Sequence, residues 1–377
     1  MGIHWAQVEQ NVNRLQSRIA KATVQGNKNR VKRLQLTNSF YAKAYAVKKV
    51  TSNKGKNTSG IDKKLWSTSA SKMKAALSLT NKMYKAKPLR RVYIEKKGKN
   101  KKRPLGIPTM SDRAMQTLYA LALEPVAEST ADNVSFGFRK GRSAKDACEQ
   151  IFCVLARKCS PTWILEGDIK GCFDNINHDW LKQNVPMDKR IMTQFLESGF
   201  IYEGNLFPTS SGSPQGGAIS SLYANITLDG LEKLIQDKYH RNSRGKIKNH
   251  FRAKTKVNLV RYADDFIITA NTKETAEEIK EIVSQFLNTR GLTLSEEKTR
   301  ITHIDDGFDF LGWTFRKFKG KLIVKPSKDS IKTLLKKCST IILKEGKASS
   351  QSDLIRRLNQ VIRGWSNYHK HVVASKA

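Results

Sequence analysis

The chain has 377 residues, of which 69 are Lys or Arg and 33 are Asp or Glu, so its formal net charge is +36. A charge of this size predicts a polyanionic partner such as nucleic acid. Hydrophobic residues make up 39% of the sequence, which excludes a wholly disordered basic protein. No apolar run approaches the roughly 18 residues of a membrane-spanning helix, and the start lacks a signal-peptide core. We therefore expect an intracellular protein with no membrane partner.

The N-terminal part is predicted to be mainly helical. Apolar residues recur in steps of three and four from Trp5 to Ile19, which is typical of one helical face. A second helical stretch is expected over 29–47, and the Gly-, Ser- and Asn-rich segment 51–60 is expected to be a loop.

The next segments predict a hairpin followed by a buried helix. Residues 89–94 and 104–108 read as two strands, joined by a loop in which six of the eight residues 96–103 are basic. Residues 111–128 follow a helical period, with Ser111 or Asp112 as the cap.

The middle of the chain alternates strands and helices, which indicates an α+β or α/β core. Strands are expected at 162–169, 257–270, 300–304 and 310–318, and helices at 179–184, 188–198, 217–238 and 274–290. From 329 to 373 the pattern becomes helical and basic, which predicts a helical C-terminal domain.

Two adjacent carboxylates, Asp264 and Asp265, lie between two apolar strand-like runs. Neighbouring acids repel one another, and removing them from water is costly unless cations neutralise them. Taken alone, an Asp-Asp pair is more often a solvated hairpin turn. A third carboxylate, Asp168, ends another apolar strand and could converge on the same place. Carboxylate oxygens suit Mg²⁺, and two-metal phosphoryl transfer needs acids that hold two cations roughly 4 Å apart.

A glycine-bearing turn, residues 211–221, lies between these acidic segments and opens a predicted helix. Glycine lets a ligand approach the backbone closely, and a helix N-terminus favours anionic groups. By itself, this turn is more simply an ordinary loop and helix cap.

The order of these pieces resembles the reverse transcriptases that are encoded by bacterial and organellar group II introns. The resemblance spans nearly the whole chain, and its motifs match in order at 58–62, 88–94, 103–108, 135–139, 141–143, 167–174, 214–217, 262–265, 291–299 and 310–313. Residues 358–369 resemble the thumb, or maturase, region, which is the most discriminating part for the intron branch.

This resemblance implies an α+β right-hand polymerase. Residues 1–60 would be an N-terminal helical extension, 61–318 the fingers and palm, and 319–377 a helical thumb. Many members of the family continue into DNA-binding and endonuclease segments, and we expect these segments to be absent from this chain.

The resemblance also implies catalytic roles. Asp168, Asp264 and Asp265 would be the metal-binding catalytic acids. Phe173 would be the aromatic gate that packs against the incoming sugar and disfavours a 2′-hydroxyl, and Gln215 would contact the nucleotide or the template.

Three basic residues would contact phosphates. Lys96 and Arg103 would reach the triphosphate, which suits their side chains as donors to phosphate oxygens, although the run 96–103 could also be a solvated loop or a localisation signal. Lys298 would lie near the leaving pyrophosphate, unless it is simply a solvated lysine at a helix end.

The function that follows is an RNA-directed DNA polymerase that binds group II intron RNA, assists its splicing and copies RNA from a primed 3′-hydroxyl. It would use Mg²⁺ and dNTPs, with structured intron RNA and a DNA primer or nascent cDNA as partners, in the cytoplasm or at the nucleoid. One alternative is a splicing factor that only binds RNA, which the clustered acids disfavour because they repel an anionic ligand. Another is a free-standing reverse transcriptase with its own non-coding RNA, for example in phage defence.

Overall fold

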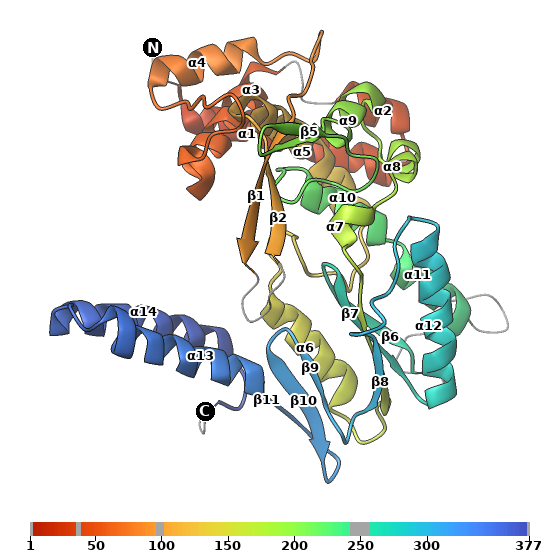
Figure 1. Cartoon of the computed structure of the whole chain (residues 1–377). Helices are drawn as coiled ribbons and strands as arrows, with labels where there is room; N and C mark the ends of the chain where they lie inside the picture. Colours follow the sequence, from red (N-terminus) through yellow and green to blue (C-terminus); the bar gives the residue numbers. More distant parts are fainter. Residues whose placement is uncertain (1–2, 35–38, 96–101, 242–255, 375–377) are drawn as a thin grey trace. The chain divides into compact units, whose positions relative to one another are not determined.

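The computed structural model describes residues 3–34, 39–95, 102–241 and 256–374 (Figure 1). The chain divides into two compact units. The first unit comprises residues 1–133, 169–231 and 284–294, and the second comprises 134–168, 232–283 and 295–377. The expected α+β class is confirmed, because both units combine helices with β-sheet.

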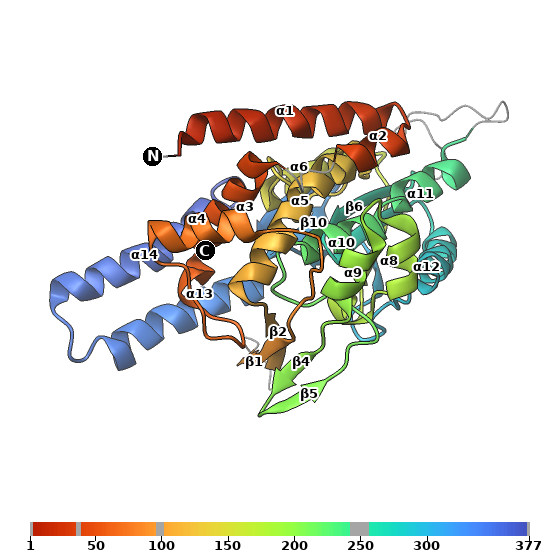
Figure 2. The same cartoon turned by 90° about the horizontal axis from the view of Figure 1, so that it is seen from above.

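The first unit begins with a group of helices. These are α1 (Trp5–Val24), α2 (Lys28–Arg33), α3 (Phe40–Ser52), a 3-10 turn (Lys54–Asn57), α4 (Ser69–Ser78) and α5 (Met110–Thr130). Both α1 and α3 contact α5, whose Ala-, Leu- and Met-rich sequence is buried over most of its length (Figure 2). The single helix expected over 29–47 is therefore two helices, α2 and α3.

The cap of α5 differs from the prediction. The helix begins at Met110, and the side chain of Thr109 accepts a hydrogen bond from the Asp112 amide. Thr109 directly follows Pro108 and has extended backbone angles, which is the conformation that an N-cap requires. Neither Ser111 nor Asp112 can be the cap, because both already lie inside the helix.

The first unit also contains a four-stranded sheet in the order β2-β1-β4-β5. Its strands are β1 (Leu89–Glu95), β2 (Lys102–Ile107), β4 (Phe200–Tyr202) and β5 (Asn205–Phe207). Strands β1 and β2 pair antiparallel, as the sequence predicts. The first unit also contains the short helices α7 (Cys172–Asn175), α8 (His178–Asn184), α9 (Lys189–Leu196) and α10 (Ser220–Leu228). The single helix expected at 217–238 is broken, since Gly230 has a φ of +96° and α11 (Leu231–Tyr239) starts after it.

The second unit is built on an antiparallel sheet in the order β6-β7-β3-β8. Its strands are β3 (Trp163–Asp168), β6 (Asn258–Tyr262), β7 (Asp265–Ala270) and β8 (Arg300–His303). Helix α6 (Ala144–Leu155) packs on β6, and α12 (Lys273–Asn288) follows β7 along the chain. A smaller sheet, β11-β10-β9, joins the same hydrophobic core through Trp313 and Phe315; its strands are β9 (Phe308–Phe310), β10 (Trp313–Phe318) and β11 (Lys321–Pro326).

The C-terminal segment is helical, as expected. Helix α13 (Lys328–Thr340), a π-helical turn (Ile341–Glu345) and α14 (Gln351–His369) form a hairpin in which α13 and α14 lie side by side (Figure 1). The hairpin is attached to the smaller sheet, because the Tyr368 ring stacks on Trp313 at 4.7 Å and its hydroxyl donates to the Leu311 carbonyl. Among the described residues, no helix is long and apolar enough to cross a membrane.

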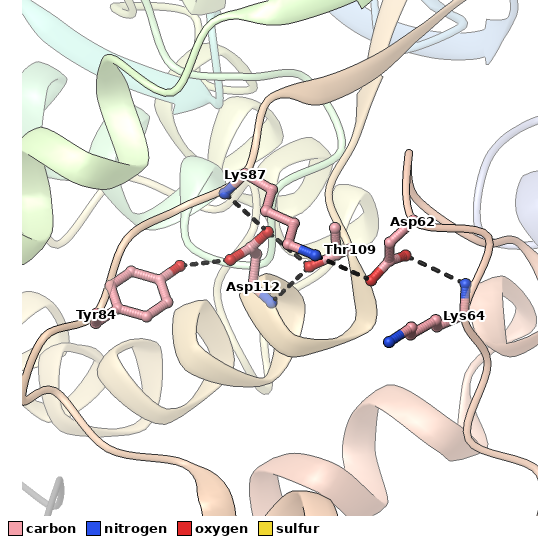
Figure 3. A network of polar contacts seen from close by, with 6 residues as sticks. All are labelled: Asp62, Lys64, Tyr84, Lys87, Thr109 and Asp112. Carbon is pink, nitrogen blue, oxygen red and sulfur yellow. Dashed lines mark hydrogen bonds and ion pairs between the residues drawn. The ribbon is translucent and has the colours of Figure 1, made fainter.

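A buried acid ties three segments of the first unit together (Figure 3). The Asp112 carboxylate accepts hydrogen bonds from the Tyr84 hydroxyl at 2.7 Å and from the Thr109 hydroxyl at 2.6 Å. The Lys87 amide also donates to it, at 3.4 Å, while the Lys87 ammonium lies 4.0 Å from Asp62. Burial raises the pKa of Asp112, and the hydrogen bonds from Thr109, Tyr84 and Lys87 oppose that rise.

We predict that Asp112→Ala lowers the free energy of unfolding by about 2–4 kcal/mol, because it removes three hydrogen bonds and leaves buried donors without an acceptor. Thermal or urea unfolding monitored by circular dichroism measures this loss. Asp179→Ala is the matched control in the same unit, since the Asp179 side chain is 82% exposed. Equal stability of the two variants would contradict the prediction.

Candidate active site

The turn between β6 and β7 carries the adjacent acids. Tyr262 pairs with Asp265 across the hairpin, so Ala263 and Asp264 form a two-residue turn. Ala263 has a φ of +57°, a left-handed conformation that residues with a Cβ adopt only at a cost in energy. Asp264 therefore lies in a hairpin turn, and Asp265 is the first residue of the strand that follows it.

The neighbouring strand brings the third acid to the same place. Strands β3 and β7 are antiparallel, and Asp168 lies directly opposite Asp265 in their register. Residues opposite one another in such a pair point to the same face, with Cβ atoms about 4.5–5.5 Å apart. Asp168 is buried, with 8% of its surface exposed. Two strand ends that are about a hundred residues apart in sequence thus present their carboxylates to each other, as the sequence predicts.

The electrostatics of the pair are unfavourable for two ionised acids. The Asp265 side chain still reaches solvent, but the protein around it removes enough water to raise its pKa to about 6. The charges of Asp264 and Asp168 contribute to this rise, Lys298 opposes it, and a hydrogen bond between the Asp265 and Asp168 carboxyl groups adds to it.

Lys298 supplies the positive charge at the cluster. Its ammonium is hydrogen bonded and ion paired to Asp168 Oδ2. The backbone holds it there, since the Ser295 amide donates to the Asp168 carbonyl at 2.8 Å and the Lys298 amide to the Ser295 carbonyl at 3.1 Å. Burial opposes the charge on Lys298, but the hydrogen bond and attraction to Asp168, with the charges of Asp265 and Asp264, raise its pKa overall. Lys298 is therefore an ion-paired member of the cluster and not a lysine that only contacts solvent at a helix end.

The acids at this turn are of the type that a divalent cation prefers. Within the part of the chain that the structure describes, no three or more His, Cys, Asp or Glu side chains are arranged to hold a metal ion as they stand. However, Asp168 and Asp265 face each other, Asp264 is adjacent, and the raised pKa of Asp265 shows that negative charge there is under-compensated. Carboxylate oxygens that solvent can reach suit a hard cation that keeps some of its water, such as Mg²⁺.

The first unit assembles a second group of expected site residues. The turn that carries Phe173 contacts the glycine-bearing loop, because the Ser213 amide donates to the Phe173 carbonyl at 2.6 Å. Gln215 Nε2 donates to the Asp174 carboxylate at 3.3 and 3.4 Å, a partner that the sequence did not indicate. The Gly106 amide in β2 donates to the Gln215 carbonyl at 2.9 Å. The loop that bears Gln215 is thus fixed to both the α7 turn and β2.

One of the expected phosphate-binding residues lies on the β1–β2 hairpin. Arg103 is exposed on β2, opposite Ile94 of β1. Lys96 lies outside the described residues. Arg103, Phe173 and Gln215 belong to the first unit, whereas the aspartates and Lys298 belong to the second.

The chain is an α+β protein in which two carboxylates face each other at the ends of paired strands. Comparison with known proteins identifies its family. A family model described as reverse transcriptase (RNA-dependent DNA polymerase) matches residues 94–315, one described as the N-terminal domain of reverse transcriptase matches 1–79, and one described as the group II intron maturase-specific domain matches 331–377.

Two relatives of similar sequence agree with these models. The group II intron-encoded protein LtrA of Lactococcus lactis subsp. cremoris is 34% identical over 361 residues, covering 81% of this chain and 59% of that protein. Protein YkfC of Escherichia coli is 33% identical over 301 residues, covering 71% of this chain and 78% of YkfC. A solved telomerase from Candida albicans has a TM-score of 0.47 and 14% identity, covering 78% of this chain and 56% of that chain.

The chain belongs to the reverse transcriptase family, in the branch of group II intron-encoded reverse transcriptases and maturases. The resemblance seen in the sequence is thereby confirmed. The right-hand polymerase expectation is confirmed as well, since this is the fold of the family. The chain spans 59% of the length of its Lactococcus relative.

The raised pKa of Asp265 predicts a pH-dependent cost in stability. Because its pKa is about 6 in the folded protein and 3.8 ordinarily, the folded state binds more protons between these values. Stability therefore falls as the pH rises through this window, and the cost is fully present above about pH 6. We expect Asp265→Asn to melt a few degrees above wild type at about pH 7.5 in a chelating buffer, with the difference lost near pH 4.

Differential scanning fluorimetry across this pH range measures the effect. Asp306→Asn is the control, because Asp306 is an exposed aspartate of the same unit. A wild-type melting temperature equal to that of Asp265→Asn at every pH would contradict the assignment.

Proposed function

We propose that this protein is an RNA-directed DNA polymerase that binds group II intron RNA, assists its splicing and copies RNA into cDNA from a primed 3′-hydroxyl. The observation that supports this most strongly is the facing pair Asp168 and Asp265, with Asp264 adjacent, at the ends of two paired strands. Two ionised carboxylates so close together are electrostatically costly in a protein without bound cations, and the arrangement becomes favourable when cations bind between them.

We propose Mg²⁺ as the physiological cation, held by Asp168, Asp264 and Asp265. When bound, a pair of such ions supplies Lewis acidity for in-line attack of the primer hydroxyl on the α-phosphate of a dNTP. The chain's own part is to hold the three carboxylates ionised and in place. Lys298 is paired to Asp168 in the free protein, and its ammonium would instead donate hydrogen bonds to a phosphate oxygen of the leaving group during the reaction.

The first unit would bind the nucleotide. Arg103 presents several donors for triphosphate oxygens from the exposed β2 strand, and Lys96 would do the same. Phe173 would pack against the sugar and disfavour a 2′-hydroxyl. Gln215 would contact the nucleotide or the template from a loop whose backbone is held by β2 and by the α7 turn.

The basic surface supports binding of structured RNA, which is recognised mainly through its phosphates and 2′-hydroxyls. Helix α1 buries Val8, Val12 and Ile19 on one face, and its other face exposes the basic residues Arg14, Arg18 and Lys21. Helices α13 and α14 add further exposed lysines and arginines. We propose residues 1–60 as the N-terminal extension, 61–318 as fingers and palm, and 319–377 as thumb, in a protein of the cytoplasm or nucleoid.

The decisive experiment is primer extension on an RNA template with dNTPs and Mg²⁺. We predict that wild type extends the primer, and that Asp264→Asn and Asp265→Asn each reduce the rate by on the order of 10³-fold or more, since loss of a metal ligand removes several kcal/mol of transition-state stabilisation. RNA binding should stay close to that of wild type, because no cationic contact is removed. Asp306→Asn should extend like wild type.

Wild-type protein that binds RNA tightly but never extends would overturn the polymerase and favour the splicing factor that only binds RNA. Equal binding of group II intron RNA and unrelated structured RNA, with extension intact, would instead favour the free-standing reverse transcriptase. Splicing of a group II intron precursor, with and without the protein, separates these two polymerases.

A second prediction concerns ionic strength. If six to ten phosphates are neutralised by Lys and Arg, the dissociation constant for RNA should rise by roughly 10³ to 10⁵ between 50 and 200 mM salt. Replacing the α1 residues Arg14, Arg18 and Lys21 with Gln should make the logarithmic slope shallower. Filter binding or fluorescence anisotropy across a salt series measures both effects, and an unchanged slope would exclude α1 from the RNA interface.

A further inference from the structure

The motif at 135–139 begins beside β6, the strand that leads to the turn carrying Asp264. Ser135 forms a parallel bridge with Arg261 of β6. The Arg261 amide donates to the Val134 carbonyl, and the Phe136 amide donates to the Arg261 carbonyl, both at 2.9 Å. The segment 134–136 thus lies beside β6 and is joined to it by a single β-bridge, within the same compact unit.

The bridged segment 134–136 is itself held in place. The guanidinium groups of Arg139 and Arg142 both donate to the Ser135 carbonyl, at 3.1 and 2.9 Å. Ser135 is fully buried, and Phe136 belongs to the hydrophobic core of the unit. The position of the segment is therefore fixed by the core as well as by its pairing with β6.

Gly137 comes next, and it leaves no room for a side chain. A Cβ at this position would lie 2.3 Å from the Ala263 amide nitrogen, 2.9 Å from the Ala263 Cβ and 2.9 Å from the Tyr262 carbonyl carbon. The first and last of these are backbone atoms of the turn that presents Asp264. Contacts this short do not occur between a Cβ and its neighbours, so a side chain here would displace the turn.

The turn that Gly137 touches has a conformation that needs support. Ala263 is left-handed, with a φ of +57°, at a position where glycine would be the unstrained choice. The side chain of Arg261 is completely buried beneath it, and Arg261 Nη1 donates a long hydrogen bond of 3.4 Å to the Ala263 carbonyl. A strained turn persists where surrounding contacts determine it, and here those contacts come from Gly137 and Arg261.

We infer that Gly137 and Arg261 are positioning residues for the polymerase reaction: together they fix the β6–β7 turn, and thereby the places of Asp264 and Asp265 opposite Asp168. The inference rests on the proposed function. Neither residue contacts substrate in this role. The bridged segment 134–136 sets the position of Gly137, and Gly137 sets how closely the turn can approach.

The test is Gly137→Ala with Gly364→Ala as the matched control. Gly364 lies in α14 with open space where a Cβ would be, so alanine is tolerated there. We expect Gly137→Ala to lower kcat for single-nucleotide addition by about 10- to 100-fold, because small misplacements of catalytic groups have effects of this size. KM for dNTP and the dissociation constant for template-primer should stay within about twofold of wild type, a split that general loss of structure does not produce.

A second readout does not depend on activity. Electron paramagnetic resonance titration with Mn²⁺, used alone as the probe, should give a dissociation constant about tenfold higher for Gly137→Ala than for Gly364→Ala, as for other groups that orient metal ligands. Arg261→Lys adds no volume, and it should shift kcat and Mn²⁺ affinity in the same direction. This variant provides the test if Gly137→Ala does not fold.

The outcomes separate the inference from the proposed function. If wild type extends primers and both variants match Gly364→Ala in kcat and in Mn²⁺ affinity, the positioning role is wrong. If wild type does not extend primers at all, the proposed function fails, and the Mn²⁺ titration still decides whether Gly137 controls the carboxylate site.

Discussion

The main constraint at the strand ends of the second unit is the cost of a negative charge on Asp265, which desolvation and the neighbouring Asp264 and Asp168 all increase. Antiparallel pairing of β3 with β7 places Asp168 opposite Asp265, and partial desolvation with the charges of Asp264 and Asp168 raises the pKa of Asp265 to about 6. A protein without cations bears this cost in its folded state. At the Mg²⁺ site that we propose, divalent cations would take up this charge and remove the cost.

Other features of the unit follow from that constraint. Lys298 pairs with Asp168 and offsets part of the charge. The turn that carries Asp264 contains a left-handed Ala263, and Gly137 packs against its backbone so closely that only hydrogen fits. The acids are therefore on a rigid sheet with a supported turn, which is what reactions that depend on positioning require. In the first unit, the loop that carries Gln215 is held in a similar way by backbone hydrogen bonds, from the Gly106 amide to the Gln215 carbonyl and from the Ser213 amide to the Phe173 carbonyl.

Much of this could be predicted from sequence, because strand ends and their acids leave local signals. The apolar runs before Asp168 and around Asp264 predicted the strands, and the ordered motifs predicted the family. Features set by long-range contacts could not be predicted. Lys298 meets Asp168 across 130 residues of sequence, and no periodicity records such a pair. The predicted cap of α5, Ser111 or Asp112, is wrong because Thr109, directly after Pro108, has the extended backbone conformation that an N-cap requires. Gly137 lies in the motif at 135–139, but its contact with the β6–β7 turn joins segments that are far apart in sequence, and no local pattern indicates it.

The central claim, that the clustered aspartates are costly until cations bind, is tested most directly by melting wild type and Asp265→Asn during a MnCl₂ titration at about pH 7.5 without nucleic acid. The account predicts a crossing: the variant melts higher in chelator, and wild type gains stability with Mn²⁺ until it melts higher than the variant. Parallel curves, with wild type and variant responding equally to Mn²⁺, would contradict the assignment of Asp265 as a metal-binding residue.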